Sequence, residues 1–352
     1  MVERHPPRSL RARALFAGAV AGGLGWAAQH RAVTRATARM QPGHPPDGAG
    51  GGVLAFPAGV EHRTVETDDG AAIHVVERGS GPAVVLLHGI GLSAAVWVGQ
   101  IADLSADHRV VAVDLRGHGA STVGHDGFLS RRPRAGGLSR LAEDLAQVLA
   151  ALSLERAVVV GHSVGAMVCL QYLHDAGSAS VQRRVSALGL VSCGGGPFLA
   201  VPGWSRTARV VGALTPAGVL LLDRLGIDVL PSRDLRWWAG RLGFGGDPLP
   251  EQVYATEALI RATPVRTLTS LGAAVGLFDI PAALLDVALP MLVVVGRKDR
   301  LTPVRHARAL VPALGDAHVV VLDGAGHMVM LERRAELSEL LADLAATVRT
   351  GP

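Results

Sequence analysis

The sequence contains one stretch that decides how the rest of the chain is interpreted, Ala157-Val158-Val159-Val160-Gly161-His162-Ser163-Val164-Gly165-Ala166. A run of small and β-branched residues precedes Gly161, and such a run is typical of a strand buried on both faces of a parallel sheet. Apolar residues with roughly helical spacing come next, at Ala166, Met167, Leu170 and Tyr172. The stretch therefore predicts a buried strand, a tight turn and a helix.

Ser163 lies in this turn, with Gly161 two positions before it and Gly165 two positions after it. This arrangement indicates a strained strand-to-helix turn that presents the serine hydroxyl above the sheet, next to the positive end of the following helix. The five residues alone also fit an ordinary strand-to-helix turn. A serine hydroxyl is a weak nucleophile until a base takes its proton, so the interpretation depends on the other residues of the chain.

The composition is that of a globular protein. The chain has 352 residues, of which 49% are hydrophobic and 18% are charged, so it can bury one large core or two modest ones. Its two cysteines, Cys169 and Cys193, are too few for a disulfide framework and lack a metal-binding spacing. They leave the redox compartment undecided.

The excess positive charge of the chain lies in the N-terminal segment, residues 1–40. The net charge of the chain is +4, but these residues hold seven arginines and one glutamate, so the rest carries about −2. No basic patch with interleaved aromatic residues is present, and we expect no nucleic-acid partner.

The same segment contains an apolar run, Ala14–Ala28, with arginines on both sides. A helix of this length spans about 22 Å, which is shorter than the ~30 Å hydrocarbon core of a bilayer. Three interpretations fit: an export signal, an anchor in the membrane surface, or a helix packed on a cytoplasmic protein. We predict a membrane-associated or exported protein, with a cytoplasmic one as the alternative.

Residues 41–59 are rich in proline and glycine and predict a linker. Strand-like runs follow at Arg63–Thr67, Ala72–Glu77, Ala83–Leu87 and Arg109–Val113. The next run is the one that leads to Ser163, and three more lie at Ala187–Val191, Met291–Val295 and His318–Leu322. Asp69-Gly70 predicts a hairpin between the first two runs. Helical patterns such as Leu138–Leu152 alternate with the later runs, which predicts a mostly parallel sheet covered on both faces, with its site at the carboxyl ends of the strands.

The predicted core comprises residues 60–196 and 289–352, and a long helical segment, residues 197–288, separates its two parts. That segment is too long for a plain connection and predicts a helical cap over the carboxyl edge of the sheet. Its aromatic residues are Trp204, Trp237, Trp238, Phe244 and Phe278. They either pack the cap against the core or form the wall of an apolar substrate pocket.

A histidine and an aspartate follow the last two predicted strands. His327, in Gly326-His327-Met328, can carry an imidazole over Ser163 and accept its proton. Asp299, in Lys298-Asp299-Arg300, can hold that imidazole in one tautomer and stabilise the imidazolium. The competing acids Asp279, Asp286 and Asp323 do not follow a buried strand so closely in the required order.

A tetrahedral oxyanion formed at Ser163 would need hydrogen-bond donors. The backbone N–H of Val164 begins the helix after the serine, and the N–H of Ile90 lies in the loop after a neighbouring strand, so we expect these two to form an oxyanion hole. One such donor lowers the barrier by on the order of 3 kcal/mol.

Together these features resemble the α/β-hydrolase superfamily over about residues 60–350. The resemblance rests on His88-Gly89-Ile90-Gly91, Asp114-Leu115-Arg116-Gly117-His118-Gly119-Ala120-Ser121, Gly161-His162-Ser163-Val164-Gly165, Gly296-Arg297-Lys298-Asp299 and Gly326-His327. It implies an eight-stranded, mostly parallel sheet flanked by helices, with a helical cap inserted after the sixth strand. It also implies that the Asp114–Ser121 loop is structural, and that His118 and His162 are packing or loop residues.

Within the superfamily that this chain resembles, epoxide hydrolases and haloalkane dehalogenases use a carboxylate nucleophile at the position of Ser163, so the serine argues against both. We predict a serine esterase that hydrolyses a small to medium apolar carboxylic ester through an acyl-enzyme, without a metal or an organic cofactor. The same triad would also serve a lactonase, a thioesterase, a carbon–carbon bond hydrolase or a cofactor-free perhydrolase. A non-catalytic binding module is the alternative from another class. The sequence leaves the oligomeric state open.

Overall fold

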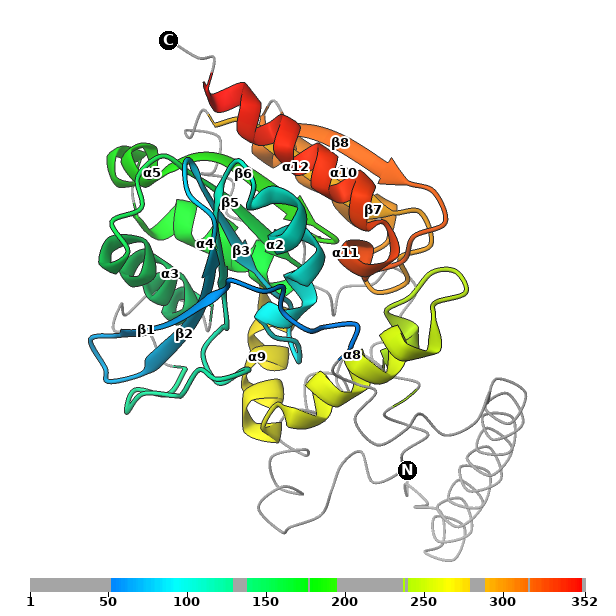
Figure 1. Cartoon of the computed structure of the whole chain (residues 1–352), viewed down its shortest axis with the longest axis horizontal. Helices are drawn as coiled ribbons and strands as arrows, with labels where there is room; N and C mark the ends of the chain where they lie inside the picture. The colour runs from blue at the N-terminus through cyan, green and yellow to red at the C-terminus, as the bar shows by residue number, and fades with distance from the viewer. Residues whose placement is uncertain are drawn as a thin grey trace, which may run out of the picture.

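The computed structural model describes residues 52–128, 138–176, 178–194, 237, 240–278, 289–315 and 317–349. Its centre is an eight-stranded sheet in the order β1-β2-β4-β3-β5-β6-β7-β8 (Figure 1). The pairs β1–β2 and β2–β4 are antiparallel, and the other five pairs are parallel. This confirms the predicted fold class, a mostly parallel sheet flanked by helices.

The strands are β1 (Glu61–Glu66), β2 (Ala72–Arg78), β3 (Ala83–Leu87), β4 (Arg109–Val113), β5 (Ala157–His162), β6 (Val185–Val191), β7 (Met291–Gly296) and β8 (Ala317–Leu322). The described helices are η1 (Ala94–Trp97), α2 (Val98–Leu104), α3 (Ser139–Ala151), α4 (Val164–Ala176), α5 (Ser178–Arg184), α8 (Pro250–Ala262), α9 (Val265–Leu277), α10 (Val304–Leu314), α11 (Val329–Glu332) and α12 (Arg334–Arg349).

The core consists of two apolar layers, one on each face of the sheet. Successive residues of a strand point to opposite faces, so Val159 of β5 joins the layer built with α3, α4 and α10, whereas Val158 and Val160 join the layer built with α2, α11 and α12. Because both faces are covered, every residue of β5 is buried. This explains why the central strands are continuous apolar runs in the sequence.

The predicted strands agree best with the structure where they are buried. β3 and β4 have the predicted bounds, whereas β1 begins at Glu61 and ends at Glu66, before the predicted end at Thr67. Only Val65 of β1 is buried, so its sequence carries little periodic signal. The strand ends early because the Thr67 hydroxyl donates a hydrogen bond to Asp69 Oδ1 (2.6 Å) and accepts one from the N–H of Ala71 (3.0 Å), which closes the turn.

The predicted N-terminal segment 1–40 and residues 41–51 of the predicted linker lie outside the described residues. The remainder of that linker already packs on the core: Leu54 is buried, and Phe56 contacts the apolar layer of α2 and α12. The described chain therefore joins the core slightly before the predicted boundary at residue 60. Among the helices that the structure describes, none combines the length and the hydrophobicity needed to cross a bilayer.

Within the predicted cap, residues 197–288, the structure describes Trp237 and residues 240–278. The helices α8 and α9 lie together beyond one end of the sheet (Figure 1). Phe244 and Phe278 are buried in the two apolar layers, and Trp237 contacts one of them. These three aromatic residues therefore pack against the core, and Trp204 and Trp238 lie outside the described part of the chain.

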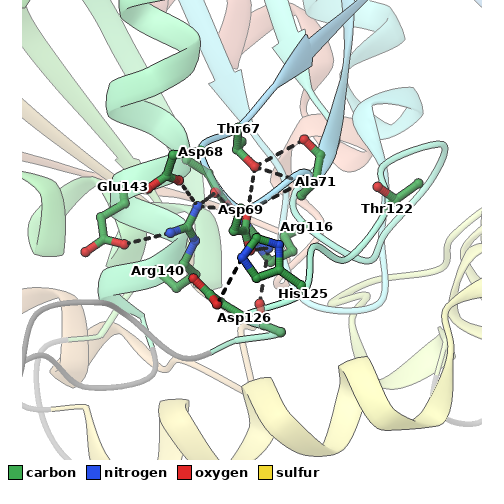
Figure 2. Close-up of polar contacts among 12 residues, drawn as sticks. Thr67, Asp68, Asp69, Ala71, Arg116, Thr122, His125, Asp126, Arg140 and Glu143 are labelled. Carbon is green, nitrogen blue, oxygen red and sulfur yellow. Dashed lines mark hydrogen bonds and ion pairs between the residues drawn. The ribbon is translucent and has the colours of Figure 1, made fainter.

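A buried network of charges ties the β1–β2 turn to α3 and to the loop after β4 (Figure 2). Arg116, with no exposed side-chain surface, donates to Asp69 (2.7 Å) and Asp144 (2.6 Å). Arg140 of α3 donates to Asp68 (2.6 Å) and Asp69 (3.1 Å). Burial by itself raises the pKa of Asp69, but hydrogen bonds from Arg116 and Thr67 outweigh it and hold that pKa well below its usual range.

Candidate active site

Ser163 lies at the turn between β5 and α4, in a left-handed backbone conformation with φ of 52°. Its N–H donates to the carbonyl of Val191 at the end of β6 (2.9 Å), and its own carbonyl accepts from the N–H of Ala166 (3.1 Å). Such a conformation is uncommon for a residue other than glycine and is held here by the hydrogen bonds on both sides. It matches the strained turn that the sequence predicts.

The glycines on both sides of Ser163 are explained by close backbone contacts. A Cβ atom on Gly161 would overlap the backbone nitrogen of Ala166, and one on Gly165 would overlap the backbone oxygens of Leu87 and His88. The first turn of α4 can therefore pack directly against the ends of β3 and β5 only because both positions lack a side chain.

His327 and Asp299, both predicted from the sequence, lie in contact. His327 Nδ1 is 2.9 Å from Asp299 Oδ2, and the Asp299 side chain has no exposed surface. Burial raises the pKa of Asp299, but hydrogen bonds from His327 and Thr302 outweigh it, and the net effect lowers this pKa to about 2. Asp299 is therefore an ionised hydrogen-bond acceptor that orients the imidazole.

Thr302 is a further member of this cluster that the sequence interpretation left out. Its Oγ1 lies 2.7 Å from Asp299 Oδ2, 2.9 Å from the carbonyl of Ser192 and 3.2 Å from His327 Nδ1. The Thr302 N–H also donates to Asp299 Oδ1 (2.8 Å). A threonine three residues after an aspartate and before a proline is a local capping pattern, and that pattern was the available signal.

Ile90 and Val164, the predicted oxyanion donors, line the same cavity as Ser163. Within the described residues, neither backbone N–H has a hydrogen-bond acceptor. The Ile90 loop is held by His118, whose Nε2 accepts from the N–H of Gly91 (3.1 Å). Burial lowers the pKa of His118 to about 3, so the ring is a neutral acceptor at pH 7.

His162, the last residue of β5, contacts His327. The ring centroids are 4.7 Å apart, and His162 Nε2 donates to the carbonyl of His327 (3.0 Å). Burial holds the pKa of His162 well below its ordinary value, and the nearby His327 ring lowers it further. The ring is therefore neutral and holds the His327 backbone, which agrees with its prediction as a packing residue.

The serine, the histidine and the predicted oxyanion donors line one cavity of about 290 Å3. It lies between the carboxyl edge of the sheet and α8 and α9, and both Ser163 and His327 line it. No hydrogen bond joins the side chains of these two residues in the described structure. The other residues that line the cavity are mainly apolar, and they include Leu92, Met167, Ile260, Val275, Leu301 and Met328.

Of the competing acids, the structure describes Asp323, and this residue does not lie beside the pair. Asp323 is on the surface, with a side chain 79% exposed and paired with Arg297. Asp279 and Asp286 are outside the described residues. Of the two candidate aspartates that the structure describes, Asp299 is therefore the one at the imidazole.

The sheet, the serine turn and the histidine–aspartate pair together describe a known class of enzyme fold. The chain belongs to the α/β-hydrolase family, because the sequence model of the family described as "alpha/beta hydrolase fold" matches residues 82–334. This confirms the resemblance inferred from the sequence.

Individual relatives agree with this assignment. The uncharacterized protein Rv2715 of Mycobacterium tuberculosis is 31% identical over 71% of both chains. The putative carbamate hydrolase RutD of Variovorax paradoxus is 30% identical over 76% of this chain and 93% of its own. Among solved structures, an esterase from Exiguobacterium antarcticum has a TM-score of 0.65 and 21% identity, covering 82% of this chain and all of its own, which shows a shared fold.

Proposed function

We propose that the protein is a serine hydrolase that cleaves carboxylic esters of small to medium apolar substrates. The observation that carries the proposal is the hydrogen bond between His327 Nδ1 and the buried carboxylate of Asp299 (2.9 Å), at a cavity that Ser163 also lines. This bond leaves the Nε2 edge of the imidazole available as a base. Membership of a hydrolase family is consistent with this chemistry.

In the proposed reaction Ser163 Oγ attacks the ester carbonyl carbon while His327 takes the hydroxyl proton. The resulting oxyanion accepts hydrogen bonds from the N–H groups of Ile90 and Val164. Collapse of this intermediate breaks the bond to the alcohol, which leaves with the proton from His327. Water then attacks the acyl-enzyme, again with His327 as the base, and releases the carboxylic acid and free Ser163.

The cavity suggests the kind of substrate. Its volume of about 290 Å3 is at the small end of the range of ligand pockets, roughly 300–1,000 Å3. Its apolar walls favour an aliphatic or aryl acyl group. No aspartate, glutamate, lysine or arginine is among its described lining residues, so an ionic substrate would find no permanently charged partner there.

The test is covalent labelling of the full chain with a fluorophosphonate, which reacts with activated serines. We expect one label per molecule, lost in Ser163→Ala while the circular dichroism spectrum is unchanged. A folded wild-type protein that takes no label at Ser163 would refute the proposal and favour a non-catalytic binding module.

The same residues would also serve lactones, thioesters, carbamates, carbon–carbon bonds or perhydrolysis. A panel of p-nitrophenyl esters of increasing acyl length, assayed beside lactones, thioesters and carbamates, separates these substrate classes. We expect the highest kcat/KM with a short or medium acyl ester. A clear preference for another class would keep the mechanism and replace the proposed substrate.

A further inference from the structure

The loop that carries His327 makes most of its polar contacts with residues far away in the sequence. The backbone N–H groups of His327 and Met328 both donate to the carbonyl of Gly243, at 2.7 and 3.0 Å. Gly243 belongs to the segment that precedes α8 and is 84 residues from His327 in the chain. The position of the imidazole therefore depends on a segment outside the core strands.

Glu332 forms a second connection between the His327 loop and the segment before α8. Its Oε1 accepts from the N–H of Gly326 (2.8 Å) and its Oε2 accepts from the N–H of Gly245 (2.9 Å). One carboxylate thus bridges the residue before His327 and the segment before α8. Hydrogen bonds from amides to an ionised carboxylate are stronger than those between neutral groups.

The two backbones are packed without a side chain between them. A Cβ atom on Gly245 would overlap the backbone nitrogen of Gly326, and one on Gly326 would overlap that of Gly245. Phe244, between these contacts, is fully buried and belongs to the same apolar layer as Met328. The segment is therefore anchored in the core on one side and bonded to the His327 loop on the other.

The shape of this segment is held by Arg241 and by α8. The Arg241 guanidinium donates to the carbonyls of Phe244 (2.9 Å) and Gly246 (2.7 Å). Gln252 of α8 donates to the carbonyl of Leu331 in α11 (3.0 Å). Since Thr256 and Ile260 of the same helix line the cavity, the substrate wall and the His327 loop belong to one bonded unit.

We propose that Glu332 is a positioning residue for His327, acting through its bridge between Gly326 and the Gly243–Gly246 segment. The proposal rests on the proposed function, in which His327 is the base. Asp299 holds the ring only at Nδ1, so the distance from the imidazole to Ser163 Oγ is set by the backbone of the His327 loop. A displacement of about 1 Å in a catalytic group can cost on the order of 100-fold in rate.

The test uses Glu332→Gln in the full chain. A glutamine offers one acceptor oxygen where two N–H groups need acceptors, and its NH2 group would face one of them. We expect kcat for a p-nitrophenyl ester to fall by about 10- to 100-fold with KM changed less than about threefold. Glu332→Asp, which keeps both oxygens on a shorter side chain, is expected to restore part of the loss.

Rates are divided by the number of active sites, titrated to the end point with the fluorophosphonate, so that unfolded molecules do not contribute. Glu339→Gln is the matched control, because it removes the same charge from an exposed position of α12, and its kcat is expected to equal that of the wild type. Wild-type kcat in folded Glu332→Gln would overturn the proposal. Failure of the wild type to label would instead overturn the proposed function.

If Glu332→Gln does not fold, Gly245→Ala provides a second test of the positioning role, because its methyl group displaces the same segment from Gly326. We expect a similar fall in kcat per titrated site. Unchanged kcat in that variant would equally overturn a positioning role.

Discussion

Asp69 and Asp299 are two aspartates whose side chains are equally hidden from solvent, yet their partners differ in chemistry. Asp69 contacts the guanidinium groups of Arg116 and Arg140, which remain protonated at any pH the protein would meet (Figure 2). Asp299 contacts the imidazole of His327, a side chain that can both accept and donate a proton. In both places the partner outweighs the cost of burial and lowers the pKa of the carboxyl group.

The difference indicates what decides whether a buried carboxylate serves structure or chemistry. A partner with a permanent charge does not exchange a proton at neutral pH, and Arg116, buried with its two aspartates, holds the β1–β2 turn to α3. A partner that can exchange a proton can pass it to a bound molecule when it faces a cavity. The comparison predicts effects of opposite emphasis: a large loss of activity with a smaller loss of stability at Asp299, and a large loss of stability with little loss of activity at Arg116.

The largest effect is expected for Asp299→Asn. The amide no longer holds the imidazole in the tautomer that accepts the Ser163 proton, so kcat should fall by on the order of 10^4-fold. Steady-state hydrolysis of a p-nitrophenyl ester, normalised by active-site titration, measures this. Asp323→Asn is the control, since that side chain is 79% exposed, and it should keep the wild-type rate. A wild-type rate for Asp299→Asn together with a large loss for Asp323→Asn would show that Asp299 is not the carboxylate that assists His327.

Arg116→Met should have the largest effect on stability. The change leaves Asp69 and Asp144 buried with only Arg140 to balance them, so the free energy of unfolding should fall by about 3–5 kcal/mol. Urea titration followed by circular dichroism measures it, with the exposed Arg305→Met as a control expected to stay within about 0.5 kcal/mol. The kcat per titrated site should remain near the wild-type value; a large fall would mean that this network serves catalysis as well.

Thr302→Val tests the hydroxyl beside the Asp299–His327 pair. It removes a contact of 2.7 Å to the Asp299 carboxylate, and hydrogen bonds to charged groups contribute about 1.5–3 kcal/mol. We expect kcat to fall about tenfold with little change in KM. Thr347→Val removes a hydroxyl bonded to a helix carbonyl of α12 and should not change kcat. Equal rates for both variants would assign Thr302 to folding alone.

The smallest expected effect is on the pH dependence of stability. The pKa of Asp299 is lowered from 3.8 to about 2 in the folded protein, so its ionised form stabilises the fold above pH 4. That stabilisation is lost as the pH falls towards 2, and it amounts to about 2 kcal/mol in total. The difference in unfolding free energy between wild type and Asp299→Asn should therefore be about 1 kcal/mol smaller at pH 3 than at pH 5. Parallel curves for the two proteins would contradict the lowered pKa.

Local patterns in the sequence predicted the parts of the fold that are buried on both sides. The bounds of β3 and β4 agree residue for residue, because a strand covered on both faces must be apolar throughout. β1 was predicted less well, since only Val65 of that edge strand is buried and one residue does not define a period. The predicted cap boundaries and the N-terminal segment remain predictions.

The sequence by itself determined the serine turn, because a buried strand, two glycines and a helix succeed one another within ten residues, and it indicated the histidine and aspartate by their place after strands. Only the tertiary structure decided which groups hold them. Thr302 reaches the carbonyl of Ser192, 110 residues away, and Glu332 reaches Gly245, 87 residues away. Such contacts depend on where distant loops meet at the sheet edge, and no local periodicity encodes that meeting point.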